Sequence, residues 1–187
     1  MRRIALVLGL LTASCGGPYR LSAPGEPVDL GLYTVDPQIR WNMWSNRIWQ
    51  FWSVDGFVLH ELSFVNGLQD GQALFPRLQR RENPPLFRST MSPQEVAEFI
   101  KASLEMTHGA KNFKKSEPKP QPFGSLQGYR IDIDYADPSD LHEQALVVWV
   151  IHGQRLYLID YRGAKEYYFA KYRDVVEKII ASIRLSR

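Results

Sequence analysis

The chain has 187 residues, of which 44% are hydrophobic, 12% aromatic and 23% charged, with a formal net charge of +3. This length fits one domain with a sizeable core, and the composition excludes a disordered chain and a membrane helix bundle. The single cysteine, Cys15, excludes an internal disulfide, a Cys-x-x-Cys redox pair and a cysteine-rich zinc site.

The N-terminal residues have the features of an export signal. Arg2 and Arg3 form a positive segment, an apolar run covers residues 4–11, and small residues follow. As a helix, this run spans about 12 Å, well short of the roughly 30 Å core of a bilayer. We therefore expect a signal peptide at residues 1–14. Its removal leaves a net charge near +1, which gives no reason to expect a nucleic-acid partner.

The segment Thr12-Ala13-Ser14-Cys15 resembles the lipobox of bacterial lipoproteins, with threonine at the position where leucine is usual. In that family the cysteine carries the lipid and becomes the mature N-terminus. Gly16 stands where aspartate directs retention in the inner membrane. The resemblance therefore implies a lipid anchor on Cys15 in the outer membrane, with the protein facing the periplasm. The alternative is an ordinary secretory signal with an incidental cysteine.

The remaining chain is expected to form a flexible tether followed by one domain. Residues 15–31 are rich in glycine and proline and have no periodicity, which is typical of a linker. No internal repeat or second linker follows, so we expect a single domain at residues 32–187.

The first part of this domain is predicted to be strands. A short extended segment at residues 32–35 is followed by the turn signal Asp36-Pro37. Two runs rich in β-forming residues, 47–54 and 57–65, flank Asp55-Gly56. Asp-Gly between such runs is the strongest short-range signal of a hairpin with a two-residue turn.

A long irregular connection and then a helix are expected next. Residues 66–91 carry repeated glycine and proline and an arginine-rich run. Ser92, Pro93 and Glu95 then match a capping box with proline at the first helical position. Apolar residues at helical spacing continue to about Met106, so the helix is expected to end there.

The second half predicts a loop, three strands and a terminal helix. Residues 114–121 contain three prolines and three lysines and are expected to form a surface loop. Strict alternation at 129–135, an apolar run at 145–151 and the segment 155–161 predict strands. An amphipathic helix is expected at 168–183. The order predicts an α+β fold, a central antiparallel sheet flanked by two main helices.

Several of these segments resemble the PsbP/Mog1-like families: the residues at 33–37, 52–56 and 127–130, the pair 145–151 and 155–161, and the close at 177–185. The resemblance implies an α/β/α sandwich whose C-terminal helix packs across the sheet. It also implies a binding or assembly-support module, because the better-known members of these families assist other proteins rather than turn over substrate, and no catalytic signature accompanies the resemblance.

Tryptophan is concentrated in one short stretch that is a candidate partner-binding surface. Four of the five tryptophans fall within twelve residues, at Trp41, Trp44, Trp49 and Trp52. Trp49 and Trp52 lie on opposite faces of the predicted strand. Exposed aromatic side chains bind sugars, lipids or partner proteins, whereas buried ones close the core, and both interpretations stay open.

The irregular connection supplies a second candidate surface. Arg77, Arg80 and Arg81 have planar forks that suit the phosphates of anionic lipid headgroups or lipopolysaccharide. The alternative is an ordinary solvated loop.

Asp132 and Asp134 are the best candidates for catalysis. They share one face of the predicted strand, about 7 Å apart, a separation compatible with a pair of catalytic carboxylates. A solvated strand face and a calcium site are the other interpretations, although the spacing fails the EF-hand pattern. The four histidines have no ligand spacing, and neither a Gly-x-Ser-x-Gly nor a phosphate-binding loop is present, so we expect no metal or cofactor.

These observations predict a non-enzymatic, lipid-anchored envelope protein that binds or supports an envelope partner. One alternative is a hydrolase or ligand-binding enzyme that uses Asp132 and Asp134 in an aromatic cleft. The other is a purely structural envelope lipoprotein.

Overall fold

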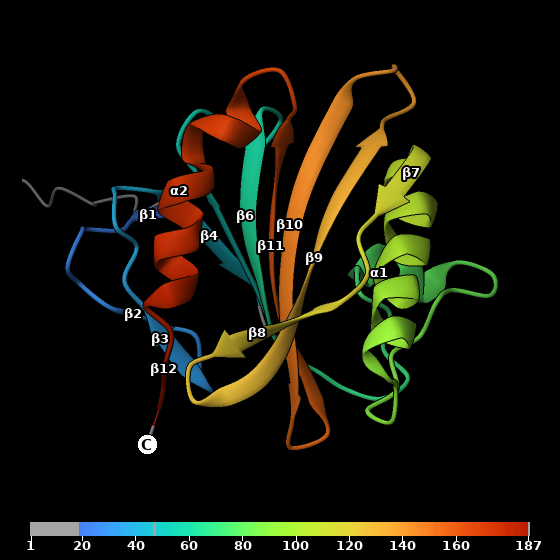
Figure 1. Ribbon diagram of the computed structural model, residues 1–187, viewed down its shortest axis with the longest axis horizontal. Helices are drawn as coiled ribbons and strands as arrows, with labels where there is room; N and C mark the ends of the chain where they lie inside the picture. The colour runs from blue at the N-terminus through green and yellow to red at the C-terminus, as the bar shows by residue number, and fades with distance from the viewer. Residues whose placement is uncertain (1–18, 47, 187) are drawn as a thin grey trace, which may run out of the picture.

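The computed structural model describes residues 19–46 and 48–186 (Figure 1). The predicted signal peptide and Cys15 lie outside the described residues. Neither α-helix in the described part of the chain is long and apolar enough to cross a membrane.

A large antiparallel sheet forms the centre of the described chain (Figure 1). Within the described residues it has nine strands in the order β1-β4-β5-β6-β11-β10-β9-β7, and β8 also pairs with β9. The strands are β1 (Tyr19–Leu21), β4 (Asn42–Asn46), β5 (Trp49–Ser53), β6 (His60–Leu68), β7 (Lys111–Lys115), β8 (Lys119–Phe123), β9 (Leu126–Ala136), β10 (His142–His152) and β11 (Arg155–Ala164). A small second sheet contains β2 (Val28–Asp29), β3 (Tyr33–Val35) and β12 (Arg184–Leu185).

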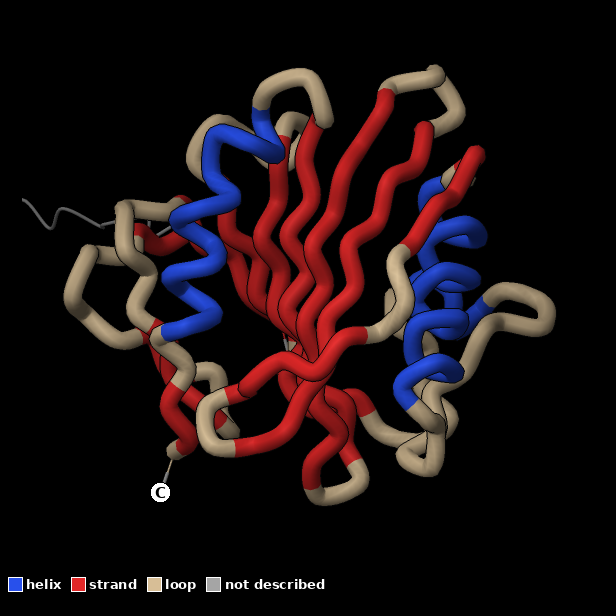
Figure 2. The backbone as a smooth tube through the Cα atoms, viewed as in Figure 1, coloured by secondary structure: helices blue, strands red, loops and turns tan. Residues whose placement is uncertain are grey.

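Two α-helices, α1 (Pro93–His108) and α2 (Tyr168–Ala181), lie against opposite faces of the large sheet (Figures 1 and 2). A short 3-10 helix, η1 (Pro76–Arg80), packs beside α1. Apolar residues from each face form a separate core, one with α1 and one with α2. Because both faces are covered, β10 is apolar almost throughout rather than alternating. The predicted α+β fold with a large antiparallel sheet and two helices is confirmed.

The capping box at the start of α1 is confirmed. The Ser92 hydroxyl accepts a hydrogen bond from the Glu95 amide, and the Glu95 carboxylate accepts one from the Ser92 amide at 2.7 Å. The helix extends past Met106 to His108, because Gly109 takes the left-handed conformation (φ 65°) and its amide caps the last turn.

Replacing Ser92 by alanine is expected to lower the free energy of unfolding by about 1 kcal/mol, because the Glu95 amide loses its acceptor. Urea titration measures the change. Ser125→Ala, at an exposed turn residue, is the matched control and should leave stability unchanged. Equal stability of both variants would show that the cap contributes nothing.

The predicted hairpin around Asp55-Gly56 is confirmed in its pairing and wrong in its turn. Strand β5 pairs with β6 in the register Trp52↔Leu62, but residues 54–59 all belong to the connection. The amides of Val54 and Asp55 both donate to Nε2 of His60, at 3.3 and 3.2 Å. This side-chain acceptor holds a longer loop in place of a two-residue turn.

The second hairpin and the terminal helix are confirmed. Strands β10 and β11 pair from Glu143↔Ala164 to His152↔Arg155, and the turn lies at Gly153 and Gln154. Both turn residues have positive φ, as the tight turns of twisted hairpins require. The helix at the C-terminus covers Tyr168–Ala181.

The predicted tether at residues 15–31 is wrong from Tyr19 onward. Strand β1 pairs with β4, with Tyr19 opposite Trp44, and β2 pairs with β3. Leu30 is buried in the core on the α2 side. The fold therefore begins at least as early as Tyr19. The hydrogen bonds of this segment come from strands that are distant in the sequence, so no local periodicity predicted them.

The predicted loop at 114–121 is also wrong. Strands β7 and β8 occupy much of it, and both pair with β9. Pro120 and Pro122 are tolerated in β8 because this strand pairs on one side only, with β9.

Candidate functional site

Three of the four clustered tryptophans are core residues. Trp41 and Trp52 are fully buried, and Trp49 is 2% exposed. Trp49 stacks on Phe51 in the α1-side core, whereas Trp52 packs in the α2-side core. The prediction of opposite faces is confirmed. As partner-binding residues these three are wrong, because Trp49 packs in the core on the α1 side and Trp41 and Trp52 pack in the core on the α2 side.

Trp44 differs from the other three because it is half-buried. Its ring lies 5.2 Å from that of Phe51. With Tyr19, Phe51, Phe57 and Glu61 it lines a groove of about 290 Å³, which we call the aromatic groove. Trp44 is therefore the one member of the four that a partner can reach within the described surface.

The three arginines lie together on η1 and just after it. Arg77, Arg80 and Arg81 are all exposed, and none forms an ion pair within the described chain. Contact between these arginines and anionic lipid stays a prediction.

Asp132 and Asp134 lie on the α2 face of β9, and basic side chains neutralise both. Asp132 contacts Arg130 at 3.3 Å and Arg173 at 3.5 Å, and Asp134 accepts a hydrogen bond from Lys165. The Lys165 hydrogen bond lowers the pKa of Asp134. A general acid needs a raised pKa, so this geometry does not favour paired-carboxylate catalysis.

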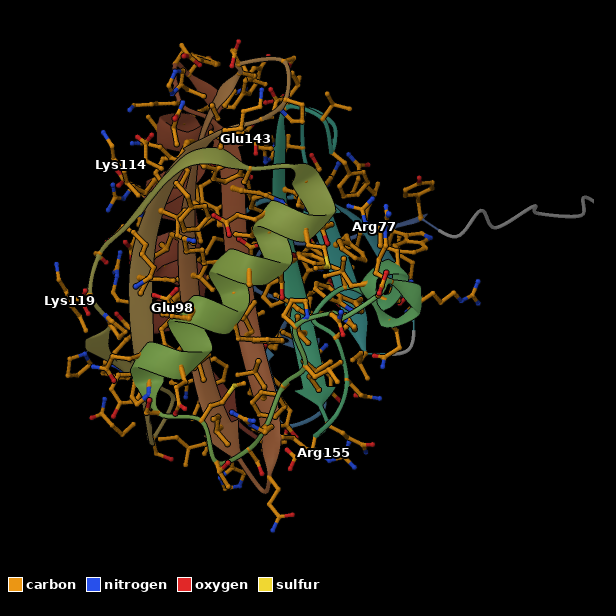
Figure 3. All side chains as sticks on the ribbon, turned by 90° about the vertical axis from the view of Figure 1, so that its right-hand side faces the viewer. Arg77, Glu98, Lys114, Lys119, Glu143 and Arg155 are labelled. Carbon is orange, nitrogen blue, oxygen red and sulfur yellow. The ribbon has the colours of Figure 1, made fainter. Side chains whose placement is uncertain are left out.

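A cluster of charged side chains lies on the other face of the sheet, where α1 ends. Glu61 of β6, Glu143 of β10, Arg162 of β11 and His108 of α1 line a pocket of about 230 Å³, which we call the charged pocket. Figure 3 shows Glu143 near the C-terminal end of α1. This position marks the point at which the apolar core beneath α1 gives way to charged residues.

Arg162 holds the charged pocket together. Its Nη2 donates to Oε1 of Glu61 at 2.6 Å, and its Nη1 lies 2.8 Å from Nε2 of His108. The Arg162 and Glu61 side chains are only 11% and 15% exposed. The Glu143 carboxylate accepts a hydrogen bond from the hydroxyl of Tyr135, the residue opposite it on β9.

A third carboxylate lies within the same charge cluster. Asp160 is 5% exposed, and its Oδ1 has no hydrogen-bond partner among the described residues. Burial raises the pKa of Asp160 from 3.8 to about 6, although Arg162 opposes the shift. Burial and the Arg162 charge lower the pKa of His108 to about 3. The carboxyl groups of Glu61, Glu143 and Asp160 therefore surround the guanidinium of Arg162, and Arg77 also acts on the His108 imidazole.

Asp160→Asn is expected to gain stability over the natural chain as the pH rises. The folded-state pKa of Asp160 lies above its unfolded value, so its contribution is present below about pH 4 and is lost towards pH 6 and above. The variant should gain about 1.4 kcal/mol per pH unit within that window. Urea titrations of both proteins across this pH window measure the difference in their free energies of unfolding. His60 and His108 are present in both proteins, so their contributions to the pH dependence cancel in this difference. A difference that does not change with pH would contradict the prediction.

The strand register explains why these residues meet. Strands β6 and β11 pair with Glu61 opposite Arg162 and Ser63 opposite Asp160. Because side chains alternate between the two faces of a strand, Glu61, Ser63, Asp160 and Arg162 all lie on the α1 face of the sheet. The signal in the sequence was a pair of charges two residues apart, Asp160 and Arg162, inside an otherwise apolar strand. The spacing of the histidines indicated no metal ligands, so the sequence pointed to no site at Glu61 or Glu143.

Exposed apolar side chains surround the charged pocket. Phe57, Val58 and Leu141 all line it and are 36%, 86% and 38% exposed. Phe57 and Glu61 also line the aromatic groove, so the two depressions are adjacent. The site therefore combines a charged floor with an apolar rim.

Within the described residues, no group of three or more His, Cys, Asp or Glu side chains is placed to hold a metal ion. Residues 19–46 and 48–186 form an α+β fold with a large antiparallel sheet, two α-helices and a pocket in which buried charge is concentrated.

No family model and no curated protein sequence matches the chain. Solved structures that are similar to it include two of low sequence identity. One is LpqN, involved in cell envelope biogenesis of Mycobacterium tuberculosis, with 10% identity, 90% of this chain and 91% of that chain covered, and a TM-score of 0.41. The other is the immunity protein TplEi of the T6SS from Pseudomonas aeruginosa, with 13% identity, 90% and 54% covered, and a TM-score of 0.41. Likeness at this level does not extend to function.

Proposed function

We propose that the protein is a non-enzymatic binding module of the bacterial cell envelope, and that it receives part of a partner protein in the charged pocket. The observation that carries this proposal is the combination of buried charge with an exposed apolar rim. Phe57, Val58 and Leu141 expose apolar surface to water at one place, beside a cavity. Apolar side chains around a concave polar centre are typical of protein interfaces.

In this proposal, lipid on Cys15 holds the protein at the outer membrane, facing the periplasm. The lipobox resemblance supports the anchor. Only residues 16–18 separate Cys15 from β1, so the chain allows at most about 15 Å between Cys15 and Tyr19. Tyr19 lines the aromatic groove. An anchored protein therefore presents this groove close to the membrane surface, where an envelope partner would meet it.

The proposal also includes a PsbP/Mog1-like α/β/α sandwich with an assembly-support role. The placement of α1 and α2 against opposite faces of the sheet supports this assignment, as does the order of the segments that resemble those families.

The anchor is tested by mass spectrometry of the mature N-terminus from the membrane fraction. We expect a lipidated Cys15, and Cys15→Ser should move the protein out of that fraction. An unmodified Cys15, or cleavage at another residue, would overturn the anchor and leave the pocket proposal standing.

The binding role is tested by photo-crosslinking in intact cells. A photo-reactive phenylalanine replaces Phe57 at the rim, and the same residue at Leu86 is the matched control, because the two side chains are 36% and 39% exposed. We expect one envelope protein to be captured from position 57 and not from position 86. Val58→Asn, an uncharged polar change at an 86% exposed residue, should weaken the capture without unfolding the protein. No product, or the same products from both positions, would support a purely structural role instead.

A further inference from the structure

We infer that the charged pocket binds an organic cation, the ammonium or guanidinium of a basic side chain on the partner, with a neighbouring apolar residue of that partner in the aromatic groove. This inference rests on the proposed function and names the chemistry of the partner segment.

The charge of the pocket lining favours a cation. Carboxylates of Glu61, Asp137 and Glu143 line the pocket, and Arg162 is the guanidinium among the lining residues. Arg77 lies close enough to act on His108 but does not line the pocket. His108 adds no positive charge near neutral pH, because burial and Arg162 hold its pKa at about 3. An excess of negative charge in a poorly solvated site is unfavourable, and an entering cation offsets it.

The pocket also contains a carboxylate with few hydrogen-bond donors. A carboxylate has about four acceptor positions, whereas Glu143 accepts one hydrogen bond from the described residues, donated by Tyr135. Asp160 is not among the lining residues, but its buried Oδ1, in the same charge cluster, has no hydrogen-bond partner in the described chain. Arg162 directs two of its N–H groups at Glu61 and His108 rather than at Glu143. Glu143 therefore keeps acceptor positions that an ammonium or guanidinium fills.

Other ligand classes fit less well. The described carboxylates are not grouped as metal ligands, and Arg162 among them repels a divalent ion. An anion would face three carboxylates. A cation with an organic stem suits the apolar rim of Phe57, Val58 and Leu141, against which methylene groups pack.

The aromatic groove indicates a protein segment rather than a free amine. The groove shares Phe57 and Glu61 with the charged pocket and continues along Trp44, Phe51 and Tyr19. A ligand that fills both depressions, of about 230 and 290 Å³, has a cation and a second apolar group. Basic and apolar residues in sequence on a peptide meet that description, and the aromatic rings add a favourable contact with the cation.

The test uses the full chain in neutral detergent and calorimetric titration with two peptides, acetyl-Phe-Lys-Phe-amide and the same peptide with norleucine in place of lysine. We expect the lysine peptide to bind at least about tenfold more tightly, and 1,5-diaminopentane to bind at least about tenfold more weakly than the lysine peptide. Norleucine has nearly the same shape without the charge, so the comparison isolates the cation.

Glu143→Gln is expected to remove the preference for lysine. Its amide oxygen still accepts from Tyr135, so the fold should persist, which a thermal unfolding scan checks. Glu98→Gln is the matched control, since this glutamate lies on α1 outside both depressions (Figure 3) and should leave the preference unchanged.

Equal binding of the two peptides, or no binding of either at about 10 mM, would overturn the inference. If the free diamine bound more tightly than the lysine peptide, the inference that the ligand is a protein segment would be overturned. These outcomes are separate from the crosslinking result: capture from position 57 with no lysine preference leaves the binding role intact and the cation wrong.

Discussion

Replacing Arg162 by methionine is expected to lower the free energy of unfolding by about 3–5 kcal/mol. The substitution leaves Glu61, Glu143 and Asp160 close together with no compensating charge, in a site where Glu61 is only 15% exposed. It also removes the 2.6 Å hydrogen bond to Glu61 and the contact with His108. Urea titration at neutral pH measures the loss.

Two comparisons separate the buried charge from other causes. Arg173→Met is the matched control: its side chain is 45% exposed and pairs with Asp132 at 3.5 Å, so it should cost at most about 1 kcal/mol. Adding Glu61→Met to Arg162→Met should restore part of the lost stability, because an apolar pair replaces a broken ion pair. Equal costs for the two arginines would show that Arg162 contributes no more than a surface residue.

Replacing Trp52 by alanine is expected to destabilise the protein by about 3–5 kcal/mol, because the fully buried ring would leave a cavity. The Trp52 ring centroid lies 4.6 Å from that of Phe64 and 6.2 Å from that of Trp41. Its indole N–H also donates to Gln50 at 3.2 Å. Thermal and urea unfolding of the purified variant measure the loss.

Trp44→Ala is the contrasting variant. Trp44 is half-buried and contacts Phe51 at the edge of the aromatic groove, so its loss should cost about 0.5–1.5 kcal/mol. In the crosslinking experiment Trp44→Ala should weaken capture while the protein stays folded. If Trp52→Ala remained as stable as Trp44→Ala, the assignment of Trp52 to the core would be wrong.

The structure divides the four clustered tryptophans into three core residues and one surface residue. From the sequence, Trp41, Trp44, Trp49 and Trp52 were candidates for one surface. In the structure, three of them support the sheet from its two faces, and the fourth lies in a groove beside a charged pocket. In the function that we propose, partner binding therefore moves from the ring cluster to Trp44 and to residues contributed by β6, β10, β11 and the end of α1.

The pattern of residues in the sequence predicted those helices and strands that depend on interactions between neighbouring positions. The capping box at Ser92, the alternation around Ile131 and the amphipathic stripe of α2 each depend on residues a few positions apart, and all three were found from the sequence. The strands at residues 19–21, 28–29 and 119–123 were missed, because their hydrogen bonds come from partners remote in the chain.

The charged pocket was missed for the same reason. Glu61 and Arg162 are 101 positions apart and meet only through the register of β6 with β11. His108 joins them because Gly109 ends α1 at that edge of the sheet. Asp132 and Asp134, which spacing favoured, were neutralised by Arg130, Arg173 and Lys165, two of which are contributed by α2 and the segment before it.

The sequence by itself determined the α+β class, the starts of both helices, the paired hairpins and the expectation of a lipid anchor on Cys15. These depend on helix caps, on periods of 2 and 3.6 residues and on a short N-terminal motif, all of which act over a few neighbouring positions. Only the tertiary structure decided which aromatic rings are buried and where charge collects. Burial and pKa depend on what packs against a side chain, and strand register sets that contact between residues far apart in the chain.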